Sequence, residues 1–95
     1  MKVLIKPSTS KGKKYMAIFM DGDKKVKTTH FGASAMSDFT KNKDPKRKAS
    51  YLARHRTTEN WADYKSAGSL SRYILWNKPT LRGSIADYKR RFSLN

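Results

Sequence analysis

Three stretches in the first third of the chain carry apolar residues in the pattern of short β-strands. Lys2–Lys6 has an apolar centre, and Pro7 ends it because proline cannot donate to a ladder. Tyr15–Met20 is apolar on both faces, which is typical of a central strand. Lys24–Phe31 is polar and rich in lysine, as exposed edge strands often are. The pattern predicts a small antiparallel sheet of about three strands, with a tight turn at Asp21-Gly22.

A helix is predicted after an irregular connector at residues 32–39, in which Met36 and Phe39 are expected to be apolar anchors. Asp44 is a good N-cap residue and Pro45 suits the first helical position, so the helix should run from Pro45 to about Arg56. Its buried stripe is expected to comprise Ala49, Leu52 and Ala53, with Tyr51 and His55 beside them.

Two further short helices are predicted in the last third of the chain. Residues 70–76, which Ser69 can cap, are apolar over most of the helix surface, so this helix should be buried. Residues 83–92 form the last helix, with Thr80 or the capping box-like Ser84–Asp87 at its start. Its stripe is expected to comprise Ile85, Tyr88 and Phe92, and Asp87 should pair with Arg91.

The order of these elements predicts an α+β fold, a small antiparallel sheet of about three strands followed by about three short helices on one of its faces. We expect one domain over residues 1–95, with a β-hairpin and sheet part at 1–31 and a helical part at 44–95. Tyr73 and Trp76 are expected in the core. Trp61 lies in a predicted loop. Whether it is a core residue or a protein-binding anchor stays open.

Composition restricts the class of protein. The chain has 95 residues, of which 37% are hydrophobic, and it has no cysteine. No apolar run approaches the roughly 20 residues that a membrane span needs, and no secretory signal is recognisable. Without cysteine, neither a disulfide nor a thiolate metal site is possible. We therefore expect an intracellular or virion setting and no membrane span.

Positive charge is the strongest signal in the sequence. Lys and Arg number 22 against 7 Asp and Glu, which gives a formal net charge of +15. This charge is spread evenly, with net values of +6, +4 and +5 over residues 1–31, 32–60 and 61–95. A chain that repels itself in this way usually has a polyanionic partner, and nucleic acid is the commonest.

Nine basic residues are candidates for contacting phosphates. Arginine forms forked hydrogen bonds to phosphate, so the arginines of the predicted 45–56 helix come first. The lysines of the predicted hairpin can follow a nucleic-acid backbone, but they can equally protect an exposed sheet edge. The candidates are Arg47, Arg54 and Arg56, then Lys13, Lys14, Lys25 and Lys27, together with Lys46 and Lys48.

Catalytic and metal-binding patterns are weak. Asp21-Gly22-Asp23 lacks the further ligands of a cation loop and is better explained as a turn. Arg54-His55-Arg56 could serve a phosphodiester cleavage with His55 as general base, but such a triplet on a basic helix more often contacts phosphate. We expect no enzyme activity, no metal and no cofactor, and a small nuclease stays as the third hypothesis.

Several short motifs recur in a known order. They are His30-Phe31-Gly32, Lys43-Asp44-Pro45, Arg54-His55, Glu59-Asn60-Trp61, Ser66-Ala67-Gly68, Leu70–Thr80 and Ile85–Lys89. From His30 to Phe92 the chain resembles an uncharacterised family of small basic proteins, a domain of unknown function, encoded by large nucleocytoplasmic DNA viruses. The resemblance implies a viral source and a compact domain but no activity and no site residues.

The sequence therefore favours a virion-associated, non-enzymatic protein that binds the phosphate backbone of nucleic acid non-specifically, DNA rather than RNA. The alternative is a minor capsid or structural protein that binds acidic capsid proteins. In either case the expected location is the virion or the nucleus or cytoplasm of the host cell. Oligomeric state is left open.

Overall fold

The computed structural model describes residues 1–95 and confirms the α+β class. Its sheet has three antiparallel strands in the order β1-β2-β3, with β1 at Lys2–Pro7, β2 at Lys13–Asp21 and β3 at Lys24–Ala33. The strand that is apolar on both faces, β2, is the central one, as predicted. Pro7 is the last residue of β1 opposite Tyr15, a position that an edge strand tolerates.

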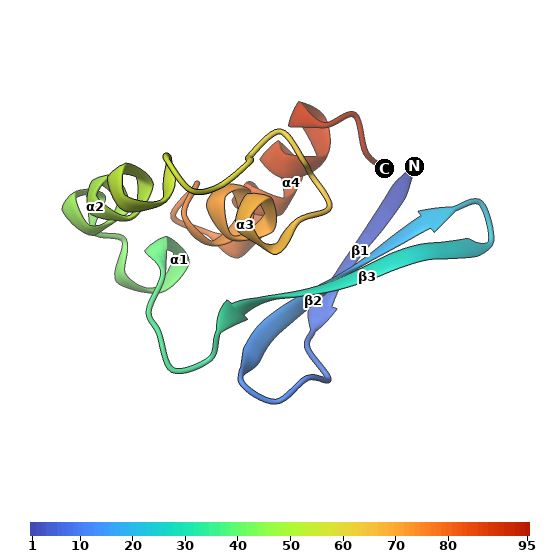
Figure 1. The fold of residues 1–95 in the computed structure, drawn as a ribbon, viewed down its shortest axis with the longest axis horizontal. Coiled ribbons are helices and arrows are strands. Elements are labelled where there is room, and N and C mark those ends of the chain that lie inside the picture. Colours follow the sequence, from blue (N-terminus) through green and yellow to red (C-terminus); the bar gives the residue numbers. More distant parts are fainter.

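The helical segments lie together on one face of the sheet (Figure 1). They are α1 at Phe39–Asn42, α2 at Pro45–His55, α3 at Ala67–Leu70, the π-helical turn η1 at Ser71–Leu75, and α4 at Leu81–Arg91. The predicted caps of α2 and α4 are confirmed, because the Asp44 carboxylate accepts from the N–H groups of Lys46 and Arg47 and the Thr80 hydroxyl accepts from that of Gly83.

The structure corrects three details of the helix predictions. The segment after the connector forms the extra short helix α1, which Asp38 caps. The cap of α3 is Ser66 rather than Ser69, so helical structure begins before Leu70. Ser84 opens no capping box, because it lies buried inside α4, where its hydroxyl accepts from the Lys78 N–H.

The buried face of α2 is displaced by one residue from the predicted stripe. Tyr51 is buried and Leu52 is half-buried, whereas Ala49 and Ala53 are exposed. The Tyr51 ring stacks on Trp76, with centroids 4.6 Å apart and an interplanar angle of 8°. Burying an aromatic ring removes far more apolar area from water than burying two methyl groups, so the tyrosine determines the orientation of the helix.

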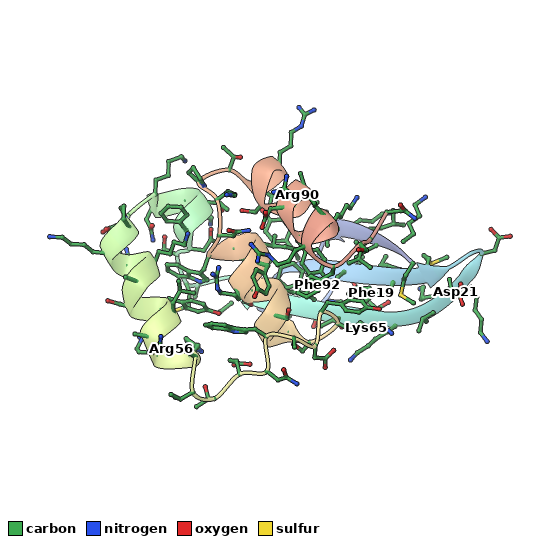
Figure 2. The ribbon with its side chains drawn as sticks, turned by 90° about the horizontal axis from the view of Figure 1, so that it is seen from above. Phe19, Asp21, Arg56, Lys65, Arg90 and Phe92 are labelled. Atoms are coloured by element: carbon green, nitrogen blue, oxygen red, sulfur yellow. The ribbon has the colours of Figure 1, made fainter.

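The core lies between the helices and the covered face of the sheet. Alternate residues of the strands contribute Val3, Ala17, Phe19 and Phe31, and the α3–η1 segment contributes Leu70, Ile74 and Leu75. Figure 2 shows Phe19 and Phe92 near the centre of the molecule. The Tyr64 ring contacts both, at centroid distances of 5.9 and 5.7 Å. The predicted burial is thus confirmed for Leu70 and residues 74–76, whereas residues 71–73 are half-buried and Tyr73 packs against the core rather than inside it.

The two chain ends meet at the edge of β1 (Figure 1). The Val3 N–H donates to the Asn95 carbonyl and the Asn95 N–H donates to the Met1 carbonyl, both at 3.0 Å. Leu94 beside them is buried in the core. The C-terminal residues therefore cover backbone groups that an edge strand would otherwise expose. None of the helices has the length and apolar character needed to cross a membrane.

Substituting Gly32 tests how closely η1 lies against β3. Gly32 has φ +80°, and a Cβ there would lie 2.7 Å from Leu75 Cδ1. Gly12 has a similar φ of +84° but open space around it. We expect Gly12→Ala to cost about 1 kcal/mol of unfolding free energy from backbone strain alone. Gly32→Ala should cost about 1–3 kcal/mol more, because the core must accept an extra methyl group.

Urea denaturation of both variants measures the difference. Equal losses for the two glycines would mean that Leu75 moves aside freely, which contradicts close contact between η1 and the sheet.

Candidate nucleic-acid interface

Two adjoining hollows form one groove between α2 and the connector that follows β3. Their volumes are about 350 and 440 Å³, and both are lined by Met36, Ser37, Arg54 and Trp76. We call the two hollows together the groove. The end of β2, the connector and α2 therefore shape a single concave surface from segments far apart in the sequence.

Basic side chains from two separate elements line the groove. Lys13 comes from the start of β2, and Lys46, Arg47 and Arg54 come from α2. All four were candidates from the sequence, but their proximity could not be seen there. Together with Lys14 they face two acidic residues, so the lining has a formal net charge of +3.

The fifth basic residue, Lys14, is engaged within the protein. Its Nζ lies 2.5 Å from the Asp38 Oδ2, and both side chains are almost fully buried. Burial opposes the ionisation of Asp38, but hydrogen bonds from Lys14 and Thr40 and the charge of Lys14 outweigh it and hold its pKa below the ordinary 3.8. The pair ties the connector to β2 and so fixes one wall of the groove.

Aromatic rings form the floor. Tyr51 stacks on Trp76 on one side and on His55 on the other, where the ring centroids are 4.3 Å apart. Burial raises the pKa of Tyr51 to about 12, and the charge of Glu59 adds to the effect. The phenol is therefore protonated at neutral pH and adds no negative charge to the groove.

Glu59 lies close to the same floor. Its Oε1 is 3.8 Å from His55 Nδ1. Its carboxylate also lies so close to the backbone of Gly68 that a Cβ at that position would require the Glu59 side chain to move. No group of three or more His, Asp or Glu side chains is arranged to hold a metal ion.

Four of the other predicted contacts lie outside the groove. Lys48 points inward, donates to the Asn77 carbonyl at 2.7 Å and lies over the Phe39 ring. Burial, together with the charges of Arg72 and Lys78, lowers its pKa. Arg56 is exposed at the end of α2, and Lys25 and Lys27 are exposed on the β2–β3 hairpin. Figure 2 shows Arg56 and Asp21, at the hairpin tip, at opposite ends of the molecule.

Met36 and Trp76 line the groove but were not predicted to do so. Met36 was expected to anchor the connector in the core; instead its side chain is 63% exposed. A single sequence cannot distinguish these roles, because an exposed methionine and a buried one have the same hydropathy. Trp76 is buried as predicted, and only the fold reveals that it also borders the groove.

Trp61, whose role the sequence left open, is half-buried beside Arg72. The guanidinium carbon lies 5.4 Å from the indole centroid, and the same group lies 4.9 Å from the Tyr73 ring. The Arg72 side chain also donates to the Trp76 carbonyl at 3.1 Å. These contacts give Trp61 a packing role next to η1, and it does not line the groove.

The chain belongs to a family of unknown function, DUF5754, whose model matches residues 3–55. The match covers the sheet, α1 and α2, and it includes the four groove cations Lys13, Lys46, Arg47 and Arg54. It begins earlier and ends earlier than the resemblance noted between His30 and Phe92. No curated protein and no solved structure matches the chain significantly.

The Lys14–Asp38 pair predicts a stability that depends on pH. Because the folded pKa of Asp38 is depressed, the pair should stabilise the fold above about pH 4 and lose its contribution as the pH falls through that lowered pKa. We expect Asp38→Asn to lose about 3–5 kcal/mol at pH 7, because Lys14 remains buried without a counterion. The difference from the unmodified protein should shrink toward pH 2.

Urea unfolding at a series of pH values measures this dependence. Asp44→Asn is the matched control, since asparagine caps a helix about as well as aspartate and Asp44 has no buried cation partner. A loss at Asp38 that is unchanged at acidic pH would contradict a role for the ionised pair.

Proposed function

We propose that this DUF5754 protein is a non-enzymatic, virion-associated protein that binds the phosphate backbone of nucleic acid, DNA in preference to RNA, through the groove. The observation that carries the proposal is the convergence of Lys13, Lys46, Arg47 and Arg54 on one concave surface. The even distribution of charge along the sequence gave no reason to expect such a concentration.

Phosphate binding suits these four residues for electrostatic reasons. None of them forms an ion pair within the fold, whereas Lys14 is paired with Asp38. Cations that neutralise phosphates release condensed counterions, which gives affinity without sequence preference. Arg47 and Arg54 can also form forked hydrogen bonds to phosphate oxygens.

The viral setting rests on the resemblance to proteins of large DNA viruses. In such a virus a small basic protein can coat or condense the genome inside the particle. The corresponding location is the virion, or the nucleus or cytoplasm of the infected cell before assembly. The proposed activity is neutralisation of phosphate charge, which requires no catalytic group.

A second candidate is a minor capsid or structural protein, and the uncovered face of the sheet favours it. Leu4, Met16, Ile18 and Met20 are half-buried there and share a face by register. Lys2, Lys6 and Lys25 stand opposite these residues or beside them on the same face. An apolar centre with a basic border fits an acidic protein surface better than a second copy of a chain of charge +15.

Removing two groove arginines tests the nucleic-acid proposal. We expect Arg47→Ala with Arg54→Ala to weaken binding to duplex and single-stranded DNA by at least about tenfold, since hydrogen bonds to charged groups contribute about 1.5–3 kcal/mol each. The slope of log K against log salt should fall by about one for each lost phosphate contact. Fluorescence anisotropy of labelled oligonucleotides over a series of salt concentrations measures both quantities.

Lys25→Ala with Lys27→Ala is the matched control, because it removes the same charge from the distant hairpin. It should change affinity much less. If both double variants weaken binding equally, net charge rather than the groove is responsible. If the unmodified protein does not bind at about 0.15 M salt, the acidic-protein candidate replaces this one.

A further inference from the structure

The groove has a property that phosphate binding alone does not need. It is hollow and partly apolar, with the exposed Met36 at its border and the Tyr51 and Trp76 rings in its lining. A polyanion can be held by cations on a flat or convex surface. A concave apolar lining between cations suits a ligand that has an apolar part as well as charges.

Its size suits a small planar group. Volumes of about 350 and 440 Å³ lie near the lower end of the range for small-molecule sites. The bases of a duplex are stacked on one another and cannot enter a hollow of this kind without leaving the stack. An unpaired base of a single strand can do so. Because Trp76 and His55 cover the two faces of Tyr51, contacts of the base with Met36 and with the edges of the aromatic rings then add affinity.

Cations flank this hollow on two sides. Lys13 and Tyr51 line one of the two hollows, and Lys46 and Arg47 line the other. Arg54 lines both. A strand that crosses the groove would therefore meet cations before and after the apolar lining. The methionine at its border has an unbranched, polarisable side chain that adapts well to an aromatic face.

Polar groups lie beside the apolar ones. Ser37 lines both hollows, Ser50 lines one of them, and the Glu59 carboxylate lines the other. Hydroxyl and carboxylate groups can bond to the edges of a base, which has donors and acceptors around its ring. Few such groups converge, so the site would accept a base without strong selection among bases.

We propose that the groove takes one unstacked nucleobase of a single strand, held between Met36 and the Tyr51–Trp76 lining, with the neighbouring phosphates on the groove cations. This inference rests on the proposed function and names its substrate class. It assigns Met36 a binding role that accounts for an exposed apolar side chain beside a hollow.

An abasic strand separates base binding from phosphate binding. The probes are an oligothymidylate of about ten nucleotides and a strand of the same length whose sugars carry no bases, so that the number of phosphates is equal. We expect the intact strand to bind at least about fivefold more tightly, the lower end of what contact between one base and aromatic side chains provides. Anisotropy of the labelled strands measures both affinities.

Met36→Ala locates the effect in the groove. It should weaken binding of the intact strand and leave that of the abasic strand unchanged, and an exposed side chain can be truncated without loss of the fold. Val26→Ala, which truncates an exposed apolar residue on the hairpin, is the matched control and should change neither affinity. In a Trp61→Phe variant, where Trp76 is the remaining tryptophan, the intact strand should alter the fluorescence more than the abasic one.

The outcomes distinguish the two proposals. Equal affinity for intact and abasic strands would overturn base insertion and leave phosphate binding intact. A duplex that binds more tightly than the single strand would also overturn it. If the intact strand, the abasic strand and the duplex all fail to bind at moderate salt, the proposed function is overturned, and the base site with it.

Discussion

The stacking of Tyr51 on Trp76 is the contact on which the position of α2, and hence the groove, depends. Figure 1 places α2 at the edge of the helical layer, away from the sheet. Tyr51 is the only buried residue of this helix, and its ring lies nearly parallel to the Trp76 indole. The Lys48 hydrogen bond to the Asn77 carbonyl adds a second attachment to the same segment. These contacts are made to Trp76 and Asn77, which directly follow the buried α3–η1 segment. The packing of the core therefore fixes the position of α2 beside the groove.

The opposite wall depends on a different kind of contact, a buried ion pair. Lys14 and Asp38 join β2 to the connector, and Asp38 also caps α1. A buried pair contributes little net stability compared with apolar packing, but losing one partner is costly. The pair therefore acts mainly to specify where the connector lies. The groove is thus bounded by one aromatic contact and one electrostatic contact, and neither is made by the four cations that line it.

The acidic residues explain why so much positive charge remains on the surface. Asp38 and Asp44 accept hydrogen bonds at helix starts, and Asp87 accepts from Asn77, Arg90 and Arg91. The Asn77 bond is the largest reason why the pKa of Asp87 is lowered to about 2. Since several of the seven acids act inside the fold, few are free to neutralise the 22 basic residues. Burial of the core must outweigh the resulting repulsion, and a polyanionic partner would relieve it.

Local sequence determined the order of the three strands, the presence of α2 and α4, and their caps at Asp44 and Thr80, but not the short helix α1. It also determined which strand is central, because these features depend on neighbouring residues and on burial of one face. The sequence also identified the basic residues of α2 as candidates for phosphate contact, because charge follows from residue type alone. Only the tertiary structure decided that Lys13 lies with Lys46, Arg47 and Arg54, that Lys14 and Lys48 face inward, and that Met36 is exposed. Long-range packing, chiefly of Tyr51 against Trp76, displaced the buried face of α2 by one residue from the predicted face. Such contacts join residues 24 or more positions apart, and periodicity within a single segment carries no information about them.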